Sequence, residues 1–168
     1  SCARRWWAVD MAPRLFIDDA LAAGRALTLP ERAARHVQVL RLQPGAAVIL
    51  FDGRGGEWSA RVEAMGARAV RVQVLEHHPI ERELALHVTL ALAMPAGDRM
   101  DVVVEKATEL GVAAIAPLLS ERSVLRLSGE RASKRAAHWQ PIAVAACAQC
   151  GRNRVPTVLA PRQLAACL

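Results

Sequence analysis

Hydrophobic and polar positions alternate in short segments of the first half of the chain. Every second residue is apolar in 57–64 and in 70–74, and this period of two predicts strands with one buried face. Further strands are expected at 14–18 and 46–52, and the glycines of 53–56 favour a turn. The apolar side of segment 57–64 is expected to consist of Trp58, Ala60, Val62 and Ala64. Short alternating strands separated by glycine turns are typical of a small antiparallel barrel.

Segment 30–40 has the three-to-four-residue apolar spacing of a helix. Pro30 suits a first helical turn, and Ala33, Val37 and Leu40 form the apolar stripe. His36 lies beside this stripe, where a histidine is more often a packing residue than a ligand.

The second half of the chain changes from alternating strands to longer apolar runs. The polar, proline-containing segment 77–83 predicts a domain boundary. Residues 86–94 form a continuous apolar run, which predicts a strand covered on both faces, and 113–118 predict a second buried strand. A helix is expected between them at 98–110, with Gly111 as its C-cap. This strand–helix–strand order predicts a parallel α/β sheet.

Segment 128–149 is predicted to be mostly helical, although Pro141 interrupts it. A proline inside a helix either kinks it, at a cost of about 3 kcal/mol, or lies in the first turn of a new helix. Residues 157–160 predict a third strand, and 161–168 the beginning of another helix. The sequence stops after an apolar stretch, so we expect the second domain to be incomplete and to expose apolar surface.

A compact group of polar side chains follows this predicted helix. Gly151 suits the left-handed residue that ends a helix, and two side-chain amides and two guanidiniums surround it. Those groups are Gln149, Arg152, Asn153 and Arg154. The negative end of the helix dipole favours cations, and planar donors suit a phosphate or a base edge. An ordinary helix cap with solvated arginines is the alternative interpretation.

Charge is concentrated in the second half of the chain. Residues 118–162 contain eight basic and two acidic side chains, a difference that equals the whole net charge of +6. A basic segment beside a neutral remainder indicates a polyanionic partner such as nucleic acid, and a solvated helix face is the alternative.

Cysteine usage and the absence of long apolar runs narrow the class of protein. Cys147 and Cys150 have the spacing of half a zinc or redox motif, but two buried thiols on one helix explain it better. No run is long enough for a membrane span, and the first residues lack a secretory signal. We therefore expect a cytoplasmic protein with reduced thiols and no membrane partner. Residues 1–10 are expected to be an extension outside the fold.

Several motifs, in order, resemble one family. In the second half they are Gly97–Asp101, Glu105–Val112, Pro117, Ser120–Arg122 and Gln149–Pro156. In the first half they are Pro13–Phe16, His36 with Val39–Arg41, and Leu50–Gly53. Over residues 11–168 the chain is similar to the RsmE family of 16S rRNA (uracil-1498-N3)-methyltransferases.

This resemblance implies a fold and an activity. It implies a PUA-like, RNA-binding β-barrel at 11–80 and the first part of a SPOUT-type α/β methyltransferase domain at 84–168. Family members bind S-adenosylmethionine in a trefoil knot, form homodimers and methylate N3 of uridine 1498 in 16S rRNA of the small ribosomal subunit. The glycine-rich knot motifs are absent from these residues, so the cofactor-binding residues are expected beyond Leu168. The 168-residue chain alone is expected to be inactive. Ala148 replaces a frequent acidic residue of the family, and Pro141 replaces a helix-favouring one.

The chemistry assigns candidate roles. Uracil N3 lies on the pairing edge and must lose a proton, so the base must be unpaired and a general base is useful. Gln149 and Arg152 are the candidates for orienting the base. Glu109 is a candidate acid or base, or alternatively a helix-terminal carboxylate paired with Lys106 or Arg122. The candidate RNA contacts are Arg14, Arg41, Arg122, Arg126 and Arg154.

Two other functions are compatible with these residues. A non-catalytic RNA-binding module would use the same basic surface without a cofactor. A thiol redox or zinc protein would depend on Cys147 and Cys150.

Overall fold

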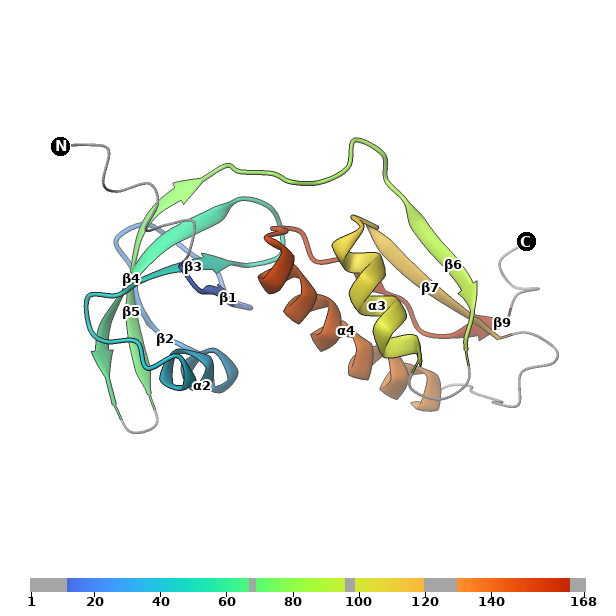
Figure 1. The fold of residues 1–168 in the computed structure, drawn as a ribbon, viewed down its shortest axis with the longest axis horizontal. Coiled ribbons are helices and arrows are strands. Elements are labelled where there is room, and N and C mark those ends of the chain that lie inside the picture. Colours follow the sequence, from blue (N-terminus) through green and yellow to red (C-terminus); the bar gives the residue numbers. More distant parts are fainter. Residues whose placement is uncertain (1–11, 67–68, 96–98, 120–129, 164–168) are drawn as a thin grey trace. The chain divides into compact units, whose positions relative to one another are not determined.

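The chain divides into two compact units, Ser1–Glu81 and Arg82–Leu168 (Figure 1). A computed structural model describes residues 12–66, 69–95, 99–119 and 130–163. The two units are described separately below.

The first unit is built on a five-stranded sheet with the order β1-β3-β4-β5-β2. Its strands are β1 (Arg14–Phe16), β2 (Ala26–Thr28), β3 (Ala47–Phe51), β4 (Glu57–Met65) and β5 (Val70–His78). Only the β1–β3 pair is parallel; the other neighbours are antiparallel. The four strands predicted in this unit, two of them from alternation, are confirmed, whereas the short strand β2 was not predicted.

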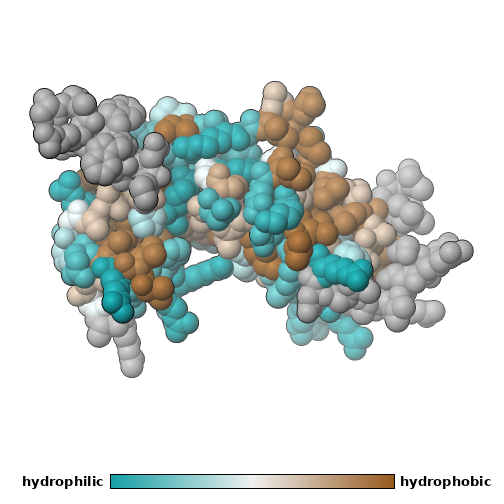
Figure 2. Space-filling model, in the orientation of Figure 1, coloured by the Kyte–Doolittle hydropathy of each residue, from teal (hydrophilic) through white to brown (hydrophobic). Residues whose placement is uncertain are grey.

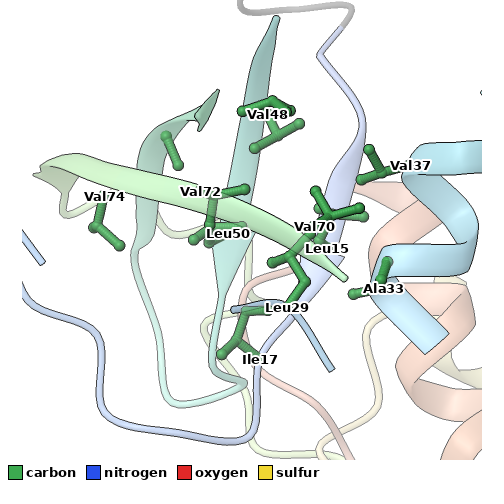
Figure 3. Close-up of a cluster of buried hydrophobic side chains, with 13 residues drawn as sticks. Leu15, Ile17, Leu29, Ala33, Val37, Val48, Leu50, Val70, Val72 and Val74 are labelled. Carbon is green, nitrogen blue, oxygen red and sulfur yellow. The ribbon is translucent and has the colours of Figure 1, made fainter. Parts of the chain in front are cut away.

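One face of this sheet forms the hydrophobic core of the first unit (Figure 3). Val70, Val72 and Val74 are fully buried, which confirms the alternation predicted for β5. The apolar face predicted for β4 is wrong at Ala64, which is exposed. Register shifts between Ser59 and Ala60 and between Val62 and Ala64 explain this, because a β-bulge changes which face the following side chains occupy.

Helix α2 (Glu31–Val39) covers part of the same core. Ala33, Ala34 and Val37 are buried, and Figure 3 shows Ala33 and Val37 directed towards the strands. The predicted helix is confirmed, but Leu40 does not complete its apolar stripe. Leu40 is the C-cap residue and is 45% exposed, because the helix ends before it.

The second unit is a parallel sheet with two helices. Its elements are β6 (Thr89–Ala93), α3 (Arg99–Glu109), β7 (Ala114–Leu119), α4 (Glu130–Cys150), β8 (Thr157–Val158) and β9 (Arg162–Gln163). β7 pairs in parallel with β6, β8 and β9. The predicted parallel α/β sheet is thus confirmed, with the buried strand β7 at its centre.

Two predictions for this sheet are wrong. Arg162 and Gln163 pair with β7 as a strand, so no helix begins at residue 161; residues 164–168 lie outside the described part. β6 is covered on one side only, because Leu90 and Leu92 pack on the core while Ala91 and Ala93 are exposed. The helices α3 and α4 both pack on the face that carries Leu90 and Leu92, so the described residues leave the other face of β6 exposed.

Helix α4 continues through Pro141 as one helix of 21 residues. A second helix starting at Pro141, one of the two predicted alternatives, is therefore excluded. Pro141 is exposed, and its ring costs the helix the hydrogen bond to the carbonyl of Ala137. Trp139 and Ala143, at 2% and 0% exposure, hold α4 against α3 and the sheet.

Exposed apolar side chains are numerous at the start of the second unit and on α3. Figure 2 shows brown, hydrophobic surface over this part of the molecule. The large apolar side chains concerned are Leu84, Leu86, Val88, Val102 and Leu110, which are 38–76% exposed. None of the described helices combines the length and hydropathy needed to cross a bilayer.

Candidate functional site at the C-terminal ends of α3 and α4

The polar group predicted after α4 divides into exposed and buried members. Gly151 ends the helix with a φ of 88°, and its N–H donates to the Cys147 carbonyl at 3.0 Å, as predicted for a left-handed terminal residue. Gln149 and Arg154 are exposed, whereas Arg152 and Asn153 are 4% and 0% exposed. The amide of Gln149 and the guanidinium of Arg154 are therefore the members of the group that face solvent.

Arg152 is held by groups of the second unit that are distant in sequence. Its Nε donates to Glu83 Oε2 at 3.1 Å, its Nη2 also contacts this carboxylate, and its Nη1 donates to the Thr108 carbonyl at 2.7 Å. Thr108 lies in the last turn of α3. Arg152 therefore donates to a carbonyl at the negative end of α3, and not at the end of α4, which it follows in the chain. Its predicted role in orienting a base stays a prediction; its contacts here join three segments.

Arg82 also holds the turn that follows α4, through a hydrogen bond to Gly151. Its Nη1 donates to the Gly151 carbonyl at 3.0 Å, next to the Glu83–Arg152 ion pair. Two consecutive residues at the start of the second unit thus bind two consecutive residues after α4. These contacts tie the start of the second unit to the turn that follows α4 and Gln149.

Glu109 lies in the last turn of α3 and is paired. Lys106 Nζ donates to both of its carboxylate oxygens at 3.0 Å, and to Glu105 Oε1 at 2.8 Å. Hydrogen bonds to Glu105 and Glu109 raise the pKa of Lys106 above its ordinary value. The structure therefore shows the pairing with Lys106 that was one predicted alternative. An acid or base role for Glu109 stays a prediction.

Two polar anchors of α4 were missed at the sequence level. Asp101 accepts a hydrogen bond from Trp139 Nε1 at 3.0 Å, and its other oxygen lies 3.1 Å from His138 Nε2. Gln140 donates to the Pro156 carbonyl and accepts from the Val158 N–H, both at 3.0 Å. The sequence offered one signal, the presence of Asp101 in the Gly97–Asp101 motif. The hydrogen bonds themselves join residues of different elements and could not be predicted from a local pattern.

The arginines predicted to contact RNA differ in their exposure to solvent. Arg41 and Arg154 are exposed. Arg14 is largely buried: its Nη1 donates to Glu57 Oε2 at 2.6 Å and its guanidinium lies 5.0 Å from the centre of the Phe51 ring. Arg122 and Arg126 lie outside the described residues.

The two helix cysteines are free thiols. Cys147 is fully buried, and its Sγ donates to the Arg154 carbonyl at 3.5 Å, while Cys150 is half-buried. Within the described ranges, no group of three or more His, Cys, Asp or Glu side chains is placed to hold a metal ion.

Comparison with known proteins connects this geometry to a family. Residues 82–168 match the model of an RNA methyltransferase domain, and residues 29–75 match that of an RNA methyltransferase PUA domain. The chain belongs to the ribosomal RNA small subunit methyltransferase E family. The predicted family and the predicted mixed α/β fold with a PUA-like first unit are confirmed.

Named relatives extend over most of this chain but not over most of their own length. Ribosomal RNA small subunit methyltransferase E of Synechocystis is 36% identical over 90% of this chain and 48% of the relative. The Bacillus subtilis protein of the same name is 33% identical over 77% of this chain and 50% of the relative. The chain thus spans about half the length of these family members.

Solved structures of similar proteins contain the methyl donor. A ribosomal RNA small subunit methyltransferase E from Neisseria gonorrhoeae bound to S-adenosyl methionine is 41% identical, with a TM-score of 0.83, over 89% of this chain and 62% of that chain. A putative methyltransferase from Legionella pneumophila with bound cofactor SAM is 35% identical, with a TM-score of 0.84, over 91% and 64%.

Proposed function

We propose that this chain is part of an enzyme that transfers a methyl group from S-adenosylmethionine to N3 of uridine 1498 in 16S rRNA of the small ribosomal subunit. The observation that carries the proposal is the 41% identity and TM-score of 0.83 to a family member bound to S-adenosyl methionine. The PUA-like first unit and the basic net charge of +6 support an RNA substrate.

The candidate residues at the end of α4 differ in exposure. Gln149 is exposed at the end of α4, whereas Arg152 and Asn153 are buried within the fold. S-adenosylmethionine supplies an electrophilic methyl group when it is bound, and no described residue is assigned to hold it. We therefore assign roles here only towards the base and the RNA.

Within this proposal, Gln149 orients the uracil. Its exposed amide can donate to a carbonyl oxygen that flanks N3 on the pairing edge of uracil, which leaves N3 itself free to react. Arg152 is the second predicted base-orienting group; through Glu83 and Thr108 it also fixes the turn that follows Gln149. Glu109 remains a proposed acid or base, held beside Lys106.

We also propose that the complete protein acts in the cytoplasm, where ribosomal RNA is its substrate, and that it forms a homodimer. The exposed apolar surface on α3 and at residues 84–88 supports an additional covering partner or segment.

The test uses the protein produced from the complete gene. It is incubated with S-adenosylmethionine and small ribosomal subunits that lack the modification, and methylated nucleosides are identified by mass spectrometry. Gln149→Ala is expected to lower the methylation rate about 10²-fold, the scale of a misplaced substrate. Gln163→Ala, an exposed glutamine of β9 in the same unit, is the control and should retain the wild-type rate.

Binding of RNA without methyl transfer would contradict the enzyme proposal and favour the non-catalytic RNA-binding alternative. Methylation at another atom or another nucleotide would contradict the assigned substrate position.

A further inference from the structure

Backbone carbonyls along segment 151–156 accept hydrogen bonds from side chains of the second unit. The pairs are Arg82 to Gly151 at 3.0 Å, Cys147 to Arg154 at 3.5 Å, and Gln140 to Pro156 at 3.0 Å. Side-chain hydrogen bonds of this kind restrict the conformations that a loop can adopt, and supporting contacts of this kind hold a functional group in its productive geometry. The segment that follows α4 is therefore pre-organised by the rest of the unit.

Arg82 differs from the other two donors in its origin. Those two belong to α4 itself, whereas Arg82 lies 69 residues before its acceptor, at the start of the second unit. Its side chain also lies along the backbone of Gly151, because a Cβ placed on this glycine would be 3.8 Å from Arg82 Cδ and 3.9 Å from its Nε. Arg82 thus contacts the residue that ends α4 both by a hydrogen bond and by packing.

The last turn of α4 is the part of the helix that needs such support. The last carbonyls of a helix have no partner within it, and helix ends fray. Gln149 lies in this turn, which ends at Cys150. The turn is closed by the Gly151 N–H, which donates to the Cys147 carbonyl at 3.0 Å. Since Arg82 binds the carbonyl of the same glycine, it holds the residue on which this closure depends.

We propose that Arg82 is a positioning residue for the methyl-transfer reaction, acting through Gly151 on the amide of Gln149. It does not touch the base. Without it the last turn of α4 opens, and the Gln149 amide adopts orientations in which it cannot hold uracil with N3 free to react. The inference rests on the proposed function, which assigns Gln149 to the base.

Steady-state kinetics of the complete protein, with small ribosomal subunits that lack the modification, test this role. Arg82→Met removes the donor and is expected to lower kcat about 10-fold, because a misplaced substrate reacts slowly. KM for the subunit should stay at the wild-type value, since phosphate contacts and not base orientation supply most of the binding. Arg135→Met, at an exposed arginine of α4, is the matched control and should keep the wild-type kcat. A wild-type kcat for Arg82→Met would overturn the proposal.

A double variant tests whether Arg82 acts through Gln149. Two residues that serve one interaction are not additive, so Gln149→Ala/Arg82→Met should be about as slow as Gln149→Ala alone. Losses that multiply would show that Arg82 acts independently of Gln149, which contradicts a positioning role.

Hydrogen exchange measures the same effect without activity. In Arg82→Met the amides of residues 149–151 are expected to exchange faster than in the wild-type protein, while those of α3 are unchanged. The thermal midpoint should stay close to the wild-type value, because Arg82 is exposed and water can replace its hydrogen bond. Equal exchange at residues 149–151 in the two proteins would refute the support of this turn by Arg82.

Failure of this inference is distinguishable from failure of the proposed function. Normal methylation by the wild-type protein, with unchanged kcat and exchange in Arg82→Met, would refute the positioning role alone. Faster exchange in Arg82→Met without any methyl transfer by the wild-type protein would refute the enzyme and leave Arg82 as the support of the turn.

Discussion

Replacing Glu83 with alanine is expected to lower the free energy of unfolding of the second unit by about 3 kcal/mol. The carboxylate of Glu83 neutralises Arg152, whose side chain is only 5% exposed. Without this partner a guanidinium stays buried, and the cost of leaving a buried charge unpaired exceeds the value of the pair itself. Chemical denaturation of the variant, followed by circular dichroism, measures the change.

Two variants test whether burial is the reason. Glu130→Ala removes a carboxylate that also forms an ion pair, with Lys134, but both side chains are more than 70% exposed. It is expected to cost less than about 1 kcal/mol. The double variant Glu83→Ala/Arg152→Met also removes the unpaired buried guanidinium. It should therefore recover part of the unfolding free energy that Glu83→Ala loses. A loss for Glu83→Ala no larger than that for Glu130→Ala would contradict this account of Arg152.

Replacing Arg14 with methionine is expected to destabilise the first unit by about 3 kcal/mol and to leave rRNA affinity unchanged. Arg14 pairs with Glu57, and the two side chains are 11% and 6% exposed. The variant leaves the Glu57 carboxylate buried without its cation. Because the guanidinium also lies over the Phe51 ring, its position suits packing inside the unit more than a contact with phosphate.

Thermal and chemical unfolding give the stability change, and filter binding to 16S rRNA gives the affinity. Arg25→Met is the matched control, since its pair with Asp19 is roughly half exposed on both sides. Adding Glu57→Leu to Arg14→Met should restore stability, because an apolar pair can replace a buried ion pair at little cost. A stable Arg14→Met protein with weakened rRNA binding would show instead that Arg14 contacts phosphate.

The elements that were predicted correctly are those with a strong local pattern. The alternating valines of β5 and the apolar run of β7 both indicated strands, because burial of one or both faces appears directly in the order of residues. Gly151 was identified as a helix end because few other residues adopt its φ of 88°.

The errors come from tertiary context that no local pattern contains. Ala64 follows a register shift that changes its face, and Arg162 pairs with β7 although its neighbours resemble the start of a helix. The apolar run around β6 is covered on one side because both described helices of the unit, α3 and α4, pack on that side. Propensity and periodicity do not specify which strand neighbours which.

In the candidate site, too, the features with a local sequence pattern were predicted and the tertiary contacts were not. The group at Gln149–Arg154 was found from residue types after a helix, and the family resemblance agrees with it. The partner of Arg152 is Glu83, 69 residues earlier, and the carbonyl that it binds belongs to α3. Its buried, structural contacts could therefore not be foreseen from the sequence.

The most direct test of the central claim is nucleoside mass spectrometry of 16S rRNA from cells in which the complete gene is deleted and then restored. The account predicts that N3-methyluridine at position 1498 disappears on deletion and returns with the intact gene. Unchanged N3-methyluridine at that position in the deletion strain would contradict the claim that this protein methylates it.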